Sequence, residues 1–83
     1  MEQLTFFTKP GCHLCEDGEW MVNVALRGRD VGVTYVDISG DAALQAAYGN
    51  RIPVLKHPRR PAELDWPFTP DTILAWLDGP ATR

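Results

Sequence analysis

The pattern of apolar and polar residues divides the chain into short strands and helices. Residues 3–8 are rich in β-branched and aromatic types and predict a strand, with Phe6 and Phe7 facing opposite sides of a buried sheet. The next apolar residues recur at helical spacing, so a helix is expected to begin at or just after Cys12. Acidic residues crowd its first turns, where the helix dipole favours them. Its expected apolar face consists of Leu14, Gly18, Met21, Val22 and Ala25.

Three further stretches, residues 33–38, 52–57 and 63–66, predict strands. Because a helix links the first two strands of the chain, those strands are expected to be parallel, with a right-handed crossover. The third predicted strand has Pro53 near its start. A proline lacks the N–H that a sheet needs, so Pro53 indicates a sheet edge, the beginning of a strand or a cis bond.

Two more helices complete the predicted order of elements. A short helix is expected to follow a cap within residues 39–41 and to run through Tyr48. The last helix is expected to have Thr69 as its cap and Pro70 at its first position, and to stop at residues 79–80. The order β-α-β-α-β-β-α predicts an α/β fold with a mixed sheet and helices on both faces.

The composition is that of a small acidic globule. The 83 residues allow one domain over 1–83, and eight Lys and Arg against eleven Asp and Glu give a net charge of −3. This balance argues against general binding to nucleic acids or anionic membranes, which requires a basic surface. No apolar run approaches the ~20 residues of a membrane span, and the first residues do not have the pattern of a signal peptide. We therefore expect a cytoplasmic location, and we separately expect the protein to be a monomer.

Both cysteines lie in one tetrapeptide, Cys12-His13-Leu14-Cys15. A disulfide across so short a ring would stabilise the fold by only about 2 kcal/mol, so its role as a structural bridge is small. A structural zinc site needs four ligands, and beyond the cysteines only His13 and His57 are candidates. Two inert buried cysteines are another alternative. The third is a redox-active dithiol.

The sequence around the cysteines favours the dithiol. Cys12 is expected at the start of a helix directly after a strand, where unpaired amides and the helix dipole stabilise an anion. Thiols of Cys-x-x-Cys motifs in this position have pKa values in roughly the 3.5–7.5 range. Cys15, one turn further, lies close enough for a disulfide. Lys9 and a protonated His13 favour the Cys12 thiolate, whereas the acidic residues that follow oppose it.

These motifs resemble those of glutaredoxin-like proteins in the thioredoxin superfamily. The resemblance covers nearly the full chain, and it is carried by segments 6–8, 9–15 and 51–54. With Trp66-Pro67-Phe68, the chain is most similar to a branch of small bacterial glutaredoxin-like proteins, many of which have no assigned substrate. The resemblance implies a thioredoxin-like fold with a four-stranded sheet. It also implies a cis-proline that faces the dithiol, at Pro53.

The resemblance also implies roles for individual residues. Cys12 would attack a substrate disulfide and Cys15 would resolve the mixed disulfide. The backbone of Ile52 would pair with an extended substrate in a form of strand addition. Lys9 matches a basic position that glutaredoxins use near a glutathione carboxylate, and Arg51 adds positive charge beside the proline.

The end of the chain departs from the glutaredoxin pattern. Glutaredoxins carry a Gly-Gly-x-Asp-like turn that holds the other end of glutathione, but residues 63–71 contain no glycine pair. Thr69 and Asp71 still offer a helix N-terminus to a carboxylate. The expected electron donor is therefore glutathione or a thioredoxin system. No bound cofactor is expected, with glutathione a candidate co-substrate and a disulfide-containing protein or small thiol as the partner.

Two classes of function follow from the sequence. The first is a thiol–disulfide oxidoreductase that reduces protein or glutathione-mixed disulfides. The second is a non-catalytic thioredoxin-fold module that acts as a thiol sensor, a docking domain or a metal-binding subunit. In the metal-binding case, the two cysteines of each chain complete a four-thiolate site only in a dimer.

Overall fold

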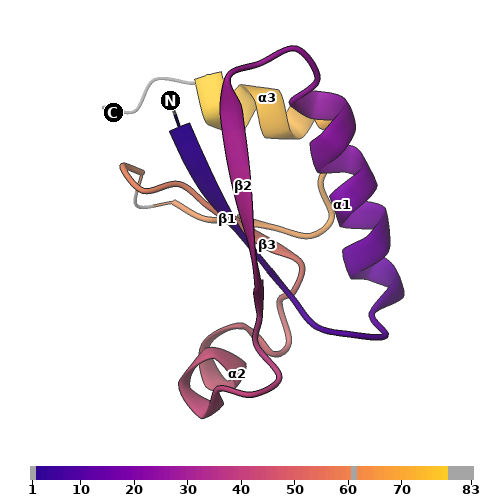
Figure 1. The fold of residues 1–83 in the computed structure, drawn as a ribbon, viewed down its shortest axis with the longest axis vertical. Helices are drawn as coiled ribbons and strands as arrows, with labels where there is room; N and C mark the ends of the chain where they lie inside the picture. Colours follow the sequence, from indigo (N-terminus) through magenta and orange to yellow (C-terminus); the bar gives the residue numbers. More distant parts are fainter. Residues whose placement is uncertain (1, 61, 79–83) are drawn as a thin grey trace.

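The elements of the fold follow the predicted order (Figure 1). The computed structural model describes residues 2–60 and 62–78. The strands are β1 (Glu2–Thr8), β2 (Val31–Asp37), β3 (Val54–Lys56) and β4 (Leu64–Asp65), and the helices are α1 (His13–Ala25), α2 (Ala42–Tyr48) and α3 (Pro70–Asp78). The predicted elements are confirmed, with boundaries that shift by one or two residues. The stop expected at residues 79–80 lies outside the described residues.

The four strands form one mixed sheet in the order β2-β1-β3-β4. β1 and β2 are parallel and paired from Glu2 with Val31 to Thr8 with Asp37, as a connection through a single helix requires. β3 runs antiparallel to β1, and β4 antiparallel to β3. β1 therefore lies inside the sheet, whereas β2 forms one of its edges.

The two faces of the sheet bury separate apolar clusters. Phe6 and Phe7 belong to different clusters, because successive side chains of a strand point to opposite faces. The cluster around Phe6 contains residues of α1 and α3, and the cluster around Phe7 contains Tyr48 of α2, with the two rings stacked at 4.1 Å between centroids. Figure 1 shows α2 at the lower end of the molecule, away from α3. Helices thus cover both faces, as predicted.

The buried face of α1 differs from the predicted face at its first turn. Cys15, Gly18, Val22 and Ala25 are buried, whereas the side chain of Leu14 is 49% exposed. The prediction for Leu14 is therefore wrong. The four buried positions follow a stripe of three- and four-residue steps, and this stripe places Cys15 toward the sheet and leaves Leu14 outside it.

The three helices are short, and polar side chains cap two of them. The Asp41 carboxylate accepts a hydrogen bond from the Leu44 amide at 3.0 Å, and the Thr69 hydroxyl accepts one from the Thr72 amide at 3.2 Å. Pro70 occupies the first position of α3, where its missing N–H costs nothing. Within residues 2–60 and 62–78, no helix has the length and apolar character of a membrane span.

His57 lies just after β3 and is 2% exposed. Its Nε2 contacts the Glu2 carboxylate, and its Nδ1 accepts a hydrogen bond from the Arg59 amide at 3.0 Å. The imidazole also meets the Trp76 ring edge-on, at 6.0 Å between centroids. In the described part of the chain, no cluster of three or more His, Cys, Asp or Glu side chains could hold a metal ion.

Candidate active site

The turn between β1 and α1 positions the two cysteines. Gly11 has a φ of +75°, a left-handed conformation that side-chain-bearing residues rarely adopt. Cys12 follows with extended dihedrals (φ −98°, ψ 108°) and is the N-cap of α1. The backbone therefore changes from extended to helical at the first cysteine, as the sequence predicts.

Cys12 and Cys15 are joined by a disulfide across the first turn of α1. Their Cα atoms are 5.2 Å apart, within the range of about 4.4–6.8 Å that disulfides require. The Cys12 sulfur occupies the place of a capping oxygen and accepts a hydrogen bond from the Cys15 amide at 3.1 Å. Cys15 is 4% exposed, whereas Cys12 is half-buried. Cys12 is thus the sulfur that a partner reaches more easily.

Pro53 packs against the helix that carries the disulfide. The Ile52–Pro53 peptide bond is cis, and the Pro53 side chain is fully buried. A Cβ atom at Gly18 would lie 2.9 Å from Cγ of Pro53 and 3.4 Å from Cζ of Phe6, and the first of these distances is shorter than real Cβ contacts allow. The loop before β3 can therefore pack this closely against α1 only because residue 18 is a glycine without a Cβ atom.

Ile52 connects the proline to the core. Its side chain is half-buried and packs against both apolar clusters. Its amide donates a hydrogen bond to the Tyr48 carbonyl at 3.0 Å. A substrate strand that pairs with this amide has to displace that hydrogen bond.

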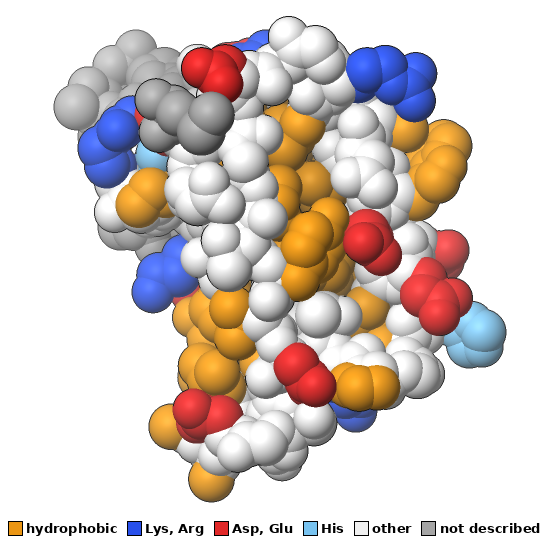
Figure 2. Space-filling model, in the orientation of Figure 1, with side chains coloured by type: hydrophobic (Ala, Val, Ile, Leu, Met, Phe, Trp, Pro, Cys, Tyr) orange, Lys and Arg blue, Asp and Glu red, His pale blue; other side chains and the backbone are white. Residues whose placement is uncertain are grey.

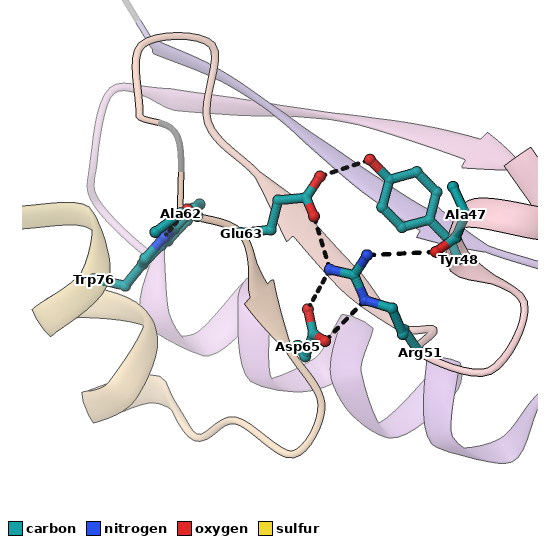
Figure 3. Close-up of polar contacts among 7 residues, drawn as sticks. All are labelled: Ala47, Tyr48, Arg51, Ala62, Glu63, Asp65 and Trp76. Carbon is teal, nitrogen blue, oxygen red and sulfur yellow. Dashed lines mark hydrogen bonds and ion pairs between the residues drawn. The ribbon is translucent and has the colours of Figure 1, made fainter.

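The guanidinium of Arg51 is held by two carboxylates of the same chain (Figure 3). It binds Asp65 in a bidentate manner, at 2.9 Å through Nε and 2.8 Å through a terminal nitrogen, and the same nitrogen binds Glu63 at 2.7 Å. The Tyr48 hydroxyl donates to the other oxygen of Glu63 at 2.6 Å. We call these four side chains, Tyr48, Arg51, Glu63 and Asp65, the arginine brace. The positive charge of Arg51 is therefore balanced within the chain.

The arginine brace shifts the ionisation of its members. Hydrogen bonds from Arg51 lower the pKa of Asp65 below its usual value. The Tyr48 hydroxyl and then the Arg51 guanidinium lower the pKa of Glu63. In turn, the hydrogen bond to the Glu63 carboxylate raises the pKa of Tyr48. Both carboxylates are therefore stabilised as anions, and they connect the loop before Pro53 to β4 and the residue that precedes it.

The other predicted site residues differ in their placement. Lys9 is exposed and lines a hollow of about 330 Å³ whose wall also includes Cys12 and Cys15. The His13 side chain is 97% exposed, with Glu16 at 3.8 Å as its ionic partner. Thr69 and Asp71 are exposed at the start of α3 and are not among the residues that line this hollow.

Several site residues were not identified from the sequence. Gly18 has a local indication, because a glycine inside a helical pattern often marks a close approach. Glu63 and Asp65 are two residues apart, so their side chains lie on the same side of an extended chain. The sequence does not show that Arg51 is their partner, because this contact depends on the order of the strands. The hollow also contains Glu19 of α1 and Tyr35 of β2. A second cis bond, Trp66–Pro67, follows β4, and the Trp66 amide donates to the Pro53 carbonyl at 3.1 Å.

Comparisons with known proteins agree with this architecture. Residues 3–78 match the glutaredoxin-like domain (DUF836). The X-ray structure of target protein XcR50 from X. campestris is 40% identical and superposes with a TM-score of 0.78 over 93% of this chain and 97% of that chain. Protein Ne2328 from Nitrosomonas europaea is 27% identical, with a TM-score of 0.67 over 90% of this chain and 89% of that chain. The structure of a malarial protein, 13% identical with a TM-score of 0.71 over 94% of each chain, is similar in fold alone. No curated protein sequence matches the chain.

We expect Gly18→Ala to destabilise the protein, because the added methyl group collides with Pro53. Overpacking of this kind costs about 1–3 kcal/mol, and the better helix propensity of alanine returns only ~1 kcal/mol. Urea unfolding of the variant measures the net loss. The control is Gly40→Ala, where the added Cβ meets no atom within 4 Å. A Gly18→Ala protein as stable as the wild type would show that the contact with Pro53 is loose.

We expect Arg51→Met to lower the free energy of unfolding by about 1–2 kcal/mol at pH 7, because it removes charge-assisted hydrogen bonds to two carboxylates. The control is Arg29→Met, which removes a single surface ion pair with Asp78 and is expected to cost about 0–1 kcal/mol. Equal losses in the two variants, measured by urea unfolding, would show that the arginine brace adds nothing beyond an ordinary surface pair.

The wild type and Arg51→Met also test the pH dependence of the arginine brace. Glu63 and Asp65 have lowered pKa values in the folded state, so their contribution is present above their unfolded pKa of about 4 and is lost as the pH falls through the folded values. The difference in stability between wild type and Arg51→Met is therefore expected to shrink between pH 5 and about pH 3. A difference that stays constant down to pH 3 would contradict an electrostatic origin.

Proposed function

This chain belongs to the glutaredoxin-like domain family (DUF836), and we propose that it is a thiol–disulfide oxidoreductase that reduces protein or glutathione-mixed disulfides. The observation that carries the proposal is the disulfide between Cys12 and Cys15 at the start of α1. A bridge that closes so short a ring adds little to the stability of the fold. We therefore infer that this disulfide serves the protein by forming and breaking reversibly during a redox reaction.

The proposed reaction begins from the reduced protein, which carries two thiols. Cys12 loses its proton, and its thiolate attacks one sulfur of the substrate disulfide. The S–S bond of the substrate breaks, a mixed disulfide forms, and the other substrate sulfur leaves as a thiolate that takes up a proton. Cys15 then gives up its proton and attacks the Cys12 sulfur, which releases the second substrate thiol. Two electrons and two protons pass from the protein to the substrate.

The geometry supports Cys12 as the attacking sulfur. It is more exposed than Cys15, and it accepts a hydrogen bond from the Cys15 amide at the positive end of α1. The same amide and dipole stabilise a thiolate when the disulfide is reduced. Because His13 extends into solvent, its proposed influence on Cys12 is limited to its charge. A general base is not required when the thiolate already exists.

The oxidised protein needs a thiol donor to return to the dithiol state. Two molecules of glutathione or one dithiol protein of the thioredoxin system supply the two electrons. The positive charge of Arg51 is already balanced by Glu63 and Asp65, which weakens any attraction for a glutathione carboxylate. We therefore favour a dithiol protein as the donor, in the reducing cytoplasm where such donors are maintained.

The assignment of the two cysteines is tested with serine variants of the pre-reduced protein. The substrate is a synthetic peptide carrying a mixed disulfide with glutathione. Cys12→Ser is expected to lose at least about 10³-fold in the rate of thiol release, because the nucleophile is absent. Cys15→Ser is expected to stop at a mixed disulfide between Cys12 and one half of the substrate, which mass spectrometry detects. Each variant is compared with the reduced wild type for its unfolding midpoint.

Two results would contradict the proposal. Full activity of Cys12→Ser would reverse the assignment of the cysteines. A single round of thiol release that neither glutathione nor a thioredoxin system can renew would indicate a stoichiometric thiol sensor instead of an enzyme.

A further inference from the structure

The hollow beside the disulfide lies across β1 from Ile52 and Pro53. Tyr35 of β2 lines it, and β1 separates β2 from β3 in the sheet, so the hollow and the proline occupy opposite sides of β1. Cys12 and Cys15 form part of its wall. Figure 2 shows hydrophobic side chains exposed between β2 and α1, bordered by acidic side chains along α1. A substrate whose sulfur reaches Cys12 therefore also meets this surface.

An aromatic ring forms one side of the hollow. Tyr35 is paired with Phe6 in the register of β1 and β2, and their ring centroids are 5.2 Å apart. Although Phe6 is buried, the Tyr35 side chain is 43% exposed. β2 is an edge strand, so in the described part of the chain Tyr35 has a neighbouring strand on one side only. A partly exposed aromatic face can bind an apolar group or a cation.

The charges around the hollow select between these two kinds of group. Glu16 and Glu19, one turn apart on α1, contribute two carboxylates, and Lys9 contributes one ammonium. Glu19 and Tyr35 line the same hollow, and partial burial, followed by the negative charge of Glu19, raises the pKa of Tyr35. The aromatic ring and the excess negative charge together favour a cationic side chain.

We propose that this hollow is a specificity pocket that receives a lysine or arginine side chain next to the reacting cysteine of a protein substrate. The inference rests on the proposed oxidoreductase function and specifies its substrate class. A cation placed over Tyr35 and beside Glu19 gains both cation–π and ionic attraction. An acidic side chain in the same position is repelled by Glu16 and Glu19. Together these effects predict that basic peptides react about 10-fold faster than acidic ones.

The test uses synthetic peptides of the form Ala-X-Cys-X-Ala, each as a mixed disulfide with 2-mercaptoethanol, with X as Arg, Gln or Glu. The pre-reduced protein is mixed with each peptide, and the rate of thiol release is measured. Each rate is divided by the rate with dithiothreitol, a neutral reductant, to remove the intrinsic reactivity of the peptide. The wild type is expected to give an Arg-to-Glu ratio of about 10.

Two variants of α1 separate the pocket from the general charge of the helix. Glu19→Gln is expected to lower the Arg-to-Glu ratio at least about 3-fold, since it removes the lining carboxylate whose charge acts on Tyr35. Asp17→Asn is the matched control: it removes the same charge from the same helix at an exposed position that does not line the hollow. The ratio of this control is expected to stay at the wild-type value.

The outcomes distinguish this inference from the proposed function. If the wild type reduces none of the three peptides, the proposed function fails and the inference fails with it. If it reduces all three at equal corrected rates, or if the two variants change the ratio equally, the oxidoreductase function stands and the specificity pocket is wrong. A ratio that falls in Glu19→Gln alone supports the pocket.

Discussion

The hydrogen bond from the Cys15 amide to the Cys12 sulfur is the contact on which the candidate active site depends. α2 and α3 begin with an oxygen of Asp41 or Thr69 as the acceptor, whereas α1 begins with a sulfur. Oxygen-bearing residues are the preferred caps, so α1 has a weaker start than the other two helices. Its stability comes instead from burial, because Cys15, Val22 and Ala25 of its buried stripe belong to the larger apolar cluster.

The surroundings of the disulfide are assembled from segments far apart in the chain. Gly18 lets Pro53 and the loop before β3 pack against α1, and the arginine brace attaches the residue before Ile52 to β4. Both contacts constrain the same short loop, one from the helix side and one from the sheet side. The loop thus has little freedom to move relative to the sulfurs, which is the kind of preorganisation that supports a reaction between positioned groups.

The sequence predicts most of what depends on neighbouring residues. The cap at Thr69, the turn before Cys12 and the opposite directions of Phe6 and Phe7 follow from local backbone preferences and from the alternation of a strand. It does not predict contacts that depend on how the strands are ordered. Arg51 contacts Asp65 only because β4 lies beside β3. The sequence alone therefore does not show that the positive charge of Arg51 is balanced.

The exposure of Leu14 and the position of Tyr35 both depend on tertiary contacts that local sequence patterns do not specify. The rotation of α1 about its axis is set by its packing on the sheet, and this packing buries Cys15 in place of Leu14. Tyr35 lines the hollow beside the disulfide because it pairs with Phe6 across β1 and β2. The sequence predicts that these strands are parallel, but it does not give the pairs of residues that face each other. A helical period fixes which residues share a face, but only the tertiary contacts fix where that face points.

β1 separates two chemically different parts of the structure, one around Pro53 and one around the hollow that Cys12 and Cys15 line. On the side of β3, the half-buried Ile52 precedes the fully buried Pro53, and the neighbouring cation, Arg51, is balanced by carboxylates. On the side of β2, an exposed aromatic ring lies among acidic side chains. Backbone contacts do not discriminate between sequences, whereas a charged pocket does. In the proposed reaction, we therefore assign general affinity for an extended substrate to the backbone of Ile52, and the choice among substrates to the hollow.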